Sequence, residues 1–375
     1  MMKLVLIGGG HSHAMALATL KESIALRMFV LNPLPNLRLI LISENIDTPY
    51  SGMLPGHIAG FYTHQQCHIN LQHLANIAQA DFYIDRVINL DLERNQVICA
   101  NHPPIDFDIL SIDIGSTPDM INVPGASEYA IPAKPWSKLL QEWNKLCLDN
   151  HYNQPLNIAI VGGGAGGVEL ALAMQARLKK KELSIHLFHK DIELMPSHHP
   201  SVQKLMKRIL LQRGIRLHLA ETVCKVEKAA IICESGLRVE CTSIFWVTQA
   251  SAPQWLKTTG LATDEKGFIL VNNTLQSISH PHILATGDIG TMVNHPRPKA
   301  GVFAVRQGKP LFNNLRRLVL AEPLQPYIPQ KQYLSLIGTG NGSAMANRGA
   351  LTLPPSRLLW FWKDWIDRQF MKQFQ

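Results

Sequence analysis

The chain has 375 residues, of which 46% are hydrophobic and 17% charged, and its formal net charge is +8. This length predicts two or three domains with a sizeable core, and the composition excludes a disordered chain. No stretch reaches the roughly 18 consecutive apolar residues that cross a bilayer, and glycines break the first apolar run too early for a signal peptide. We therefore expect a cytoplasmic protein whose basic charge meets a membrane, nucleic acid or anionic small ligands.

The cysteines argue against several classes of protein. There are six, at Cys67, Cys99, Cys147, Cys224, Cys233 and Cys241, and no two of them form a CxxC or CxxxxC pair. Such sparse and scattered cysteines disfavour a disulfide scaffold, a zinc knuckle and a local redox dithiol.

The main organisational feature is a repeated supersecondary unit. The first copy reads as a strand over 3–7, the glycines Gly8, Gly9 and Gly10, a helix from Ser12 to about Val30, and a strand over 37–42. The second copy reads as a strand over 156–161, a glycine turn from Gly162 to Gly167, a helix to about Lys181 and a strand over 184–188. Strand, glycine turn, helix and strand form the βαβ unit that binds nucleotides.

Between and after the two copies the pattern predicts further elements. Residues 83–91 and 96–100 resemble two strands of a small antiparallel meander, and 107–114 a further strand that ends at Gly115 and Ser116. A helix is predicted over 136–147, alternating strands over 223–247, and a strand over 282–286 that ends at Gly287 and Asp288.

The second glycine turn is the stronger nucleotide signal. Gly162-x-Gly164-x-x-Gly167 follows a strand and opens a helix, so Gly162 makes the tight turn, Gly164 admits a pyrophosphate and Gly167 lets helix and strand pack closely. In the first turn, Gly8-x-Gly10-x-x-His13, histidine replaces the third glycine.

Two histidines lie in the first turn, and their role is open at this point. His11 and His13 either pack and hydrogen-bond within the turn or contact a bound cofactor. Because residues two apart face different sides of a helix, they make a poor metal pair, and we expect no metal site.

The strand ends bear on cofactor choice. Ser43 and Glu44 end the second strand of the first unit, where an acidic residue binds ribose hydroxyls. His189, Lys190 and Asp191 occupy the equivalent place in the second unit; the positive residues tolerate a 2′-phosphate whereas Asp191 favours NADH, so both nucleotides stay open.

The two units, together with ATGDIG over 285–290 and IDIGSTP over 112–118, resemble the two-dinucleotide flavoproteins of the pyridine nucleotide–disulfide oxidoreductase superfamily. The resemblance implies an α/β fold with two Rossmann-like domains of three-layer ββα architecture, the NAD(P)H domain being inserted in the FAD domain. We expect an FAD domain over 1–125 and 280–330, an NAD(P)H domain over 126–279 and a C-terminal region over 331–375.

The resemblance also assigns residues. In the glycine motifs and their family equivalents, FAD is expected at Gly8, Gly9, Gly10, His11, Ser43, Glu44, Met53, Val87, Gly115, Ser116, Lys134, Gly287, Asp288, Lys299, Ala300, Gly301 and Val302. NADH or NADPH is expected at Gly162, Gly164, Gly167, Glu169, His189 and Thr248. Glu169 near the nicotinamide, Lys299 near the flavin edge and Gln307 on the acceptor side are the expected catalytic residues; each is otherwise an ordinary polar residue of a helix or loop.

The branch of the superfamily follows from the segment TPYSGMLPG over 48–56, which lacks the cysteine pair of the disulfide reductases. The surviving resemblance is to the type II NADH dehydrogenases, which implies an FAD-dependent NAD(P)H oxidoreductase that passes electrons to a quinone-like acceptor. GGGHSH, PKAGVFAVRQG and KDWIDRQFM further resemble the subgroup associated with selenophosphate synthetase. Gln249 departs from the family, which carries a glycine there. The alternatives are reduction of a soluble acceptor linked to selenium metabolism and a flavin-binding accessory of selenophosphate synthetase.

The last segment, 358–374, predicts an amphipathic helix. Its apolar residues have helical spacing, namely Leu358, Phe361, Trp362, Trp365, Ile366, Phe370 and Phe374, while Lys363, Asp364, Asp367, Arg368 and Lys372 fall largely between them. Tryptophan with basic residues suits an anionic membrane surface, and therefore a peripheral place on the inner face of the membrane; the alternative is docking on the protein's own body or on a homodimer mate. Nucleic acid is disfavoured because no basic run is interleaved with aromatic residues.

Overall fold

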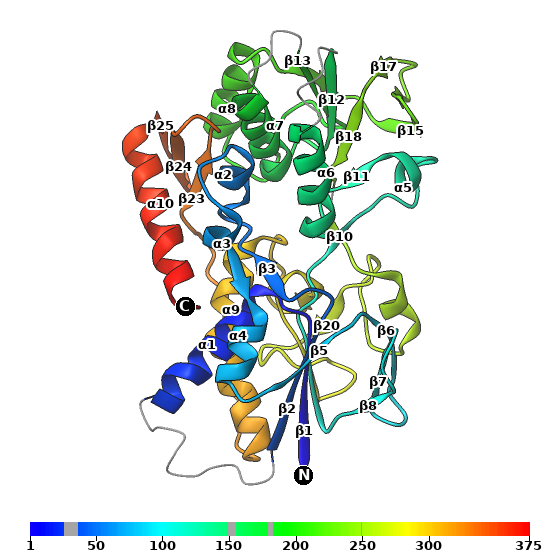
Figure 1. Cartoon of the computed structure of the whole chain (residues 1–375), viewed down its shortest axis with the longest axis vertical. Helices are drawn as coiled ribbons and strands as arrows, with labels where there is room; N and C mark the ends of the chain where they lie inside the picture. Colours follow the sequence, from blue (N-terminus) through cyan, green and yellow to red (C-terminus); the bar gives the residue numbers. More distant parts are fainter. Residues whose placement is uncertain (26–36, 149–154, 179–182, 249) are drawn as a thin grey trace.

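The computed structural model describes residues 1–25, 37–148, 155–178, 183–248 and 250–375. Two α/β lobes are stacked along the long axis of the molecule, and one long helix near the C-terminus, α10 (Arg357–Lys372), runs beside both of them (Figure 1). Within the described residues, no helix combines the length and the apolar character needed to cross a membrane.

The first lobe is built on a parallel five-stranded sheet in the order β21-β9-β1-β2-β5. Its strands are β1 (Met2–Ile7), β2 (Leu37–Ser43), β5 (Asp81–Ile84), β9 (Ile109–Ile112) and β21 (Ile283–Ala285). The helices α1 (His11–Ala25), α4 (Leu71–Ile77) and α9 (Gly301–Val319) belong to this lobe, and α1 packs along α9. Buried aliphatic side chains of β1, β2 and β9 form its core, as expected for a parallel sheet covered on its faces.

The second lobe repeats the arrangement. Its parallel sheet has the order β11-β18-β12-β13-β14, with β11 (Ile131–Pro132), β12 (Leu156–Val161), β13 (Leu183–His189), β14 (Arg216–Leu219) and β18 (Ser243–Trp246). The helices α6 (Trp136–Leu148), α7 (Ala165–Leu178) and α8 (Pro200–Gln212) belong to this lobe. The two predicted βαβ units and the α/β fold class are thus confirmed, and the predicted helix ends near Val30 and Lys181 lie outside the described residues.

Smaller elements complete the lobes. Two antiparallel three-stranded sheets are formed by β6 (Val87–Asp91), β7 (Gln96–Cys99) and β8 (Ile105–Asp106), and by β15 (Val223–Glu227), β16 (Ala230–Cys233) and β17 (Arg238–Glu240). Two-stranded pairs join β3 (Asp47–Pro49) to β4 (His68–Asn70), β10 (Thr117–Pro118) to β19 (Ala250–Ser251), and β20 (Ile269–Val271) to β22 (Gly290–Met292). The short helices are α2 (Leu54–Ile58), α3 (His64–Cys67), α5 (Ala126–Tyr129), η2 (Gln254–Thr258) and η3 (Gly287–Ile289).

The prediction of one meander strand over 83–91 was wrong. The segment splits into β5, which pairs with β2 in the parallel sheet, and β6, which belongs to the meander. The reason is the buried carboxylate of Asp85 between them, which accepts hydrogen bonds from the backbone N–H of Arg86, Asn101 and His102. A buried acid satisfied by turning backbone breaks a continuous strand.

The chain re-enters the first lobe earlier than the expected boundary at 280. Ala252, Leu256, Phe268 and Ile269 are buried in the core of the first lobe, and β19 pairs with β10. These contacts place the return of the chain near residue 250.

The C-terminal region is more than a tail with a helix. An antiparallel sheet of β23 (Ser335–Gly338), β24 (Ala344–Arg348) and β25 (Leu351–Ser356) precedes α10. Ile337 and Met345 of this sheet are buried in the core of the second lobe, whereas Trp360 and Phe370 of α10 are buried in that of the first. The C-terminal region therefore contacts both lobes.

Candidate functional site

The glycine turn of the second lobe has the geometry that a dinucleotide requires. Gly162 has φ +125°, and a Cβ there would collide with the carbonyl oxygen of Val247. A Cβ at Gly167 would collide with the carbonyl oxygen of Gly162, so α7 lies directly on the turn. Gly164, in contrast, faces open space: within the described residues, and apart from its two chain neighbours, no atom would lie within 4 Å of a Cβ there. Open backbone at the N-terminus of a helix is the surface that binds a pyrophosphate.

The glycine turn of the first lobe is closed by a histidine where the second lobe has its third glycine. Gly8 has φ +93°, and a Cβ there would collide with the backbone of Asp113. His13 is fully buried, its Nδ1 lies 2.7 Å from the Gly8 carbonyl oxygen, and its Nε2 lies 2.8 Å from Ser111 Oγ. Burial lowers the pKa of His13 to about 4, so the ring is neutral. His13 thus packs and hydrogen-bonds within the turn.

Asp113 is a buried acid of this turn that the motifs did not single out. Its Oδ2 accepts hydrogen bonds from the backbone N–H of Ser12 at 2.8 Å and of His13 at 3.1 Å. A Cβ at Gly10 or at Gly287 would collide with the same carboxyl group. Burial raises the pKa of Asp113 to about 7. This acid joins the first glycine turn to the Gly287–Asp288 motif, and its place two residues before Gly115 in IDIGSTP was the signal available in the sequence.

His11 points away from the turn toward residues 50–53. Its Nε2 accepts a hydrogen bond of 3.4 Å from the backbone N–H of Ser51, and its ring lies edge-on to Tyr50. Burial lowers the pKa of His11 to about 4, against an opposing effect of the nearby Asp288. His11 therefore joins the glycine turn to the 50–53 loop within electrostatic reach of Asp288, and its contact with the flavin stays a prediction.

Three predicted FAD residues converge on one polar cluster. Asp288 Oδ2 accepts hydrogen bonds from Lys134 Nζ at 2.6 Å and from Ser116 Oγ at 2.9 Å. Burial alone would raise the pKa of Asp288, but the contacts with Lys134 and Ser116 outweigh it and the net shift is downward. An ionised acid beside a lysine and a serine is a donor and acceptor set that suits the hydroxyls of a ribityl chain.

The N-terminus of α9 borders this cluster. Ala300 begins the helix without a side-chain cap, and a Cβ at Gly301 would contact Ser51 Oγ at 2.8 Å. A small cavity beside it is lined by Gly287, Asp288, Lys299, Ala300 and Gln307, among others. Together with the glycines that admit no Cβ, this free helix end fits a bound dinucleotide with an anionic edge.

Lys299 and Gln307, two of the three expected catalytic residues, form hydrogen bonds with the protein's own backbone and side chains. Lys299 Nζ donates to the Gly290 carbonyl oxygen and to Thr291 Oγ1, both at 2.8 Å, and lies over the Phe268 ring. Burial lowers its pKa to about 8. Gln307 is buried, and its Oε1 accepts the N–H of Gly287 at 2.7 Å. Both side chains shape the loop that carries Asp288, and their catalytic roles stay predictions.

The remaining predicted positions differ in their exposure. Met53, Val87 and Ser116 are buried, Ser43 and Val302 are half-buried, Glu44 is exposed at the end of β2, and Gly115 has φ +71°. His189 ends β13, and its Nδ1 accepts the N–H of Gly163 at 3.3 Å. Thr248 donates to the Asp119 carbonyl oxygen. Gln249 lies outside the described residues.

The inner face of α10 carries a buried pair of charges. Lys363 and Asp367 form an ion pair, with Nζ and Oδ2 2.6 Å apart. Lys363 Nζ also donates to the Gly52 carbonyl oxygen at 2.6 Å, and Asp367 lies close to Tyr50. The ring of Tyr50 packs on that of Phe370. A spacing of four residues puts the two charges on one helix face.

Glu169 faces the same helix. Its Oε1 accepts the N–H of Gly338 in β23 at 2.8 Å. Burial raises the pKa of Glu169 to about 7, against the lowering effect of Lys363. The acid of α7 is thus within electrostatic reach of the helix that holds the 50–53 loop, and its contact with the nicotinamide stays a prediction.

Two parallel sheets, each with a glycine turn between a central strand and the next helix, define a protein that binds two dinucleotides. The chain belongs to the pyridine nucleotide-disulphide oxidoreductase family, whose model matches residues 2–308. It is therefore an FAD-dependent enzyme that oxidises NADH or NADPH.

Known proteins of this kind are similar along most of the chain. The NADH dehydrogenase-like protein YutJ of Bacillus subtilis is 24% identical over 97% of this chain and 99% of its own length. Ferroptosis suppressor protein 1 of Xenopus tropicalis is 26% identical over 77% of this chain and 79% of its own length. The structure of NDH2 from Plasmodium falciparum in complex with NADH superposes with a TM-score of 0.82, at 15% identity, over 100% of this chain and 97% of that one.

Proposed function

We propose that the enzyme passes electrons from NADH or NADPH through FAD in the first lobe to a quinone-like acceptor that approaches along α10. The similarity to NADH dehydrogenase-like proteins supports the electron donor and the class of reaction. The glycine turn of the second lobe, with Gly164, Glu169 and His189 around it, is the proposed nicotinamide nucleotide site.

The observation that carries the proposed acceptor is the division of α10 into two faces. The inner face contacts the 50–53 loop through Lys363, Asp367 and Phe370. The outer face leaves four apolar side chains exposed at helical spacing, namely Leu358, Phe361, Trp362 and Trp365. An acceptor that dissolves in lipid can thus approach through the helix that touches the loop.

The same outer face is the proposed contact with an anionic membrane surface, on the inner side of the membrane. Phe361 is 64% exposed and Trp365 is 59% exposed, and such aromatic side chains insert at the lipid interface. Leu351 of the neighbouring β25 is 65% exposed and extends the apolar surface. The net charge of +8 adds attraction to anionic lipids.

The proton balance of the reaction gives Glu169 a proposed role as a group that exchanges protons. The nicotinamide nucleotide loses a hydride, which is two electrons and one proton, whereas reduction of a quinone takes up two electrons and two protons. The second proton comes from solvent. Because burial raises the pKa of Glu169 to about 7, its carboxyl exchanges a proton near neutral pH.

An anaerobic titration tests the electron path. NADH and then NADPH are added to the flavin-containing protein, the loss of flavin absorbance is followed, and a short-chain quinone is added last. We expect bleaching by at least one nucleotide and reoxidation by the quinone. Bleaching without reoxidation would point to a soluble acceptor linked to selenium metabolism, and no bleaching to the accessory of selenophosphate synthetase.

A surface variant tests the membrane route. F361S/W365S removes two exposed side chains, and I192S, at a 72% exposed apolar residue of the second lobe, is the matched control. We expect the double variant to lose sedimentation with phosphatidylglycerol vesicles and to oxidise long-chain quinone in those vesicles at least about tenfold more slowly. Its turnover of a water-soluble quinone should match that of I192S. A dimer that F361S/W365S converts to monomer would instead assign this face to a second copy of the chain.

A further inference from the structure

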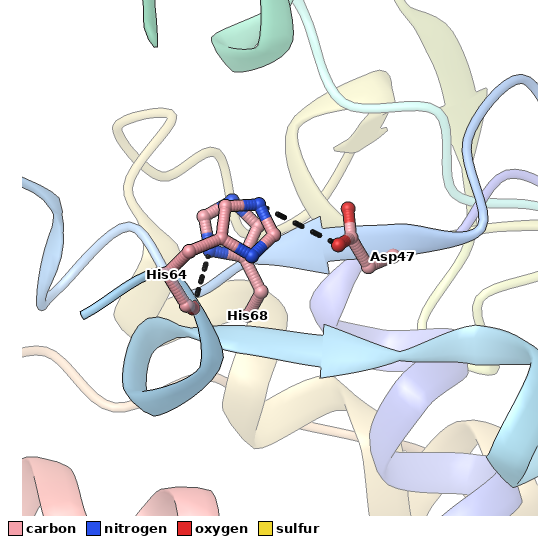
Figure 2. A group of neighbouring side chains, drawn as sticks. All are labelled: Asp47, His64 and His68. Atoms are coloured by element: carbon pink, nitrogen blue, oxygen red, sulfur yellow. Dashed lines mark hydrogen bonds and ion pairs between the residues drawn. The ribbon is translucent and has the colours of Figure 1, made fainter. Parts of the chain in front are cut away.

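A cluster of metal-binding side chains lies outside the nucleotide sites, in the segment that flanks the 50–53 loop. Asp47 begins β3, His64 begins α3 and His68 begins β4 (Figure 2). One ligand atom from each residue lies within 4.8 Å of the others. Two imidazoles and a carboxylate are a donor set that zinc and similar divalent ions bind.

The backbone fixes the positions of the three residues. β3 and β4 pair antiparallel, with Asp47 opposite Asn70 and Pro49 opposite His68. The short α3 is held by a capping box in which Thr63 and Gln66 bond each other's backbone N–H. The three side chains are thus brought to one place by hydrogen-bonded structure.

The hydrogen bonds also orient the His68 ring. Its Nδ1–H donates to the His64 carbonyl oxygen at 2.9 Å, which leaves the lone pair on Nε2. Fixing one ring nitrogen on a backbone carbonyl so that the other can bind a metal is the common arrangement for histidine ligands. Cys67 Sγ lies 3.3 Å from the same Nδ1 and therefore on the edge away from Nε2.

The carboxylate and the second ring complete the group. His64 Nε2 lies 3.6 Å from Asp47 Oδ2, and the His64 and His68 rings stack with centroids 3.5 Å apart (Figure 2). Ligand atoms around a tetrahedral zinc ion are about 3.3 Å apart, so the rings must turn out of their stack. His64 is exposed and free to turn about its side-chain bonds.

We propose that Asp47, His64 and His68 form a binding site for one divalent transition-metal ion of the zinc type, with water in the remaining position. The ion would tie β3, α3 and β4 together. Because the Tyr50 N–H donates to the Cys67 carbonyl oxygen at 2.8 Å, the tie extends to the start of the 50–53 loop. The site is distinct from the nucleotide-binding turns and does not depend on the proposed acceptor.

Zinc binding to the full-length, untagged protein tests the proposal. Calorimetric titration with Zn²⁺ should give one site, with affinity at least about tenfold weaker in H68A, H64A and D47N. H73A, which removes an exposed histidine of the neighbouring α4, is the matched control and should bind as the unaltered protein does. No site, or equal affinity in all five proteins, overturns the proposal.

Two further measurements distinguish this site from a site at the cysteines and from a loss of fold in the variants. Zn²⁺ should raise the Tm of the unaltered protein and of H73A but not of H64A, whose exposed side chain can be removed without disturbing the fold. Co²⁺ should give a spectrum of nitrogen and oxygen ligands. A strong thiolate-to-cobalt band would move the site to the cysteines and overturn the assignment.

Discussion

The two glycine turns occupy equivalent places in two similar lobes, yet they close in different ways. In the second lobe, Gly167 packs its Cα against the carbonyl oxygen of Gly162. In the first lobe, His13 stands at the same distance along the chain from Gly8, and its Nδ1 donates to the carbonyl oxygen of Gly8. The turn of the second lobe leaves no room for a side chain at this position. The turn of the first lobe holds a neutral imidazole there, which makes two hydrogen bonds. The third glycine of the motif is therefore one of two solutions to the same packing problem.

Breaking the close approach in the second lobe should have the largest effect. In G167A the new Cβ collides with a backbone oxygen, which cannot move without shifting β12 or α7. We expect a loss of about 2–3 kcal/mol in the free energy of unfolding and failure of NADH to reduce the flavin. Urea unfolding and stopped-flow flavin absorbance measure both. A G167A protein with unaltered stability would show that the two turns do not differ as described.

Removing the hydrogen-bonded imidazole of the first lobe should lower the free energy of unfolding somewhat less. H13A leaves the Gly8 carbonyl oxygen and Ser111 Oγ without their partner and opens a cavity at a fully buried position. We expect a loss of about 2 kcal/mol in the free energy of unfolding and faster release of FAD. Chemical unfolding and flavin fluorescence follow the two effects. H73A is the control, and equal stability of H13A and H73A would contradict the role of His13.

The first turn, with its buried histidine, should also make the free energy of unfolding depend on pH. The pKa of His13 is lowered to about 4 in the folded protein, so the unfolded chain binds a proton below its ordinary pKa of 6.5 that the folded chain refuses. The stability present above pH 6.5 is therefore lost as the pH falls from 6.5 toward 4.

In H13Q this slope should shrink by up to about 1.4 kcal/mol per pH unit over that range. The pKa of His11 is lowered as well, and the pKa of Asp113 is raised, so the stability that Asp113 contributes falls as the pH rises through about 7. Both effects are present in H13Q and in the unaltered protein alike. Unfolding curves at several pH values measure the difference. Parallel slopes for H13Q and the unaltered protein would show that His13 titrates normally.

The smallest effect on stability is expected where the second turn is open. G164A places a Cβ in empty space, and G166A places one at an ordinary 3.6 Å from Val247. Both should change the free energy of unfolding by less than about 0.5 kcal/mol. G164A alone should weaken NADH binding, because its methyl group stands where the pyrophosphate approaches. Equal NADH affinity of the two variants would place the nucleotide elsewhere.

Local patterns predicted the repeated units well. The strand over 156–161 agrees with β12 residue for residue, since an unbroken aliphatic run before a glycine turn leaves little choice. Patterns along the chain could not show what distant segments bring to a site. The partners of Asp113 and Lys363 came only from the fold, which places the acid against the first backbone N–H groups of α1 and the lysine against the Gly52 carbonyl oxygen.

The C-terminal helix shows the same limit from another side. The sequence pattern showed that the charged residues fall largely between the apolar ones, but not that Lys363 and Asp367 neutralise each other and can therefore be buried. The sheet of β23–β25 was not predicted, because its strands are short and carry glycine and proline, which weaken a strand pattern.

The contact between Lys363 and the Gly52 carbonyl oxygen joins positions 311 residues apart. On a ribosome, the first glycine turn and the 50–53 loop emerge well before the helix that secures the loop. The loop of the first lobe is therefore held in place only after about 300 further residues have been made. A flavin taken up during synthesis would meet an unfinished site, and we expect stable retention of FAD only after translation has passed α10.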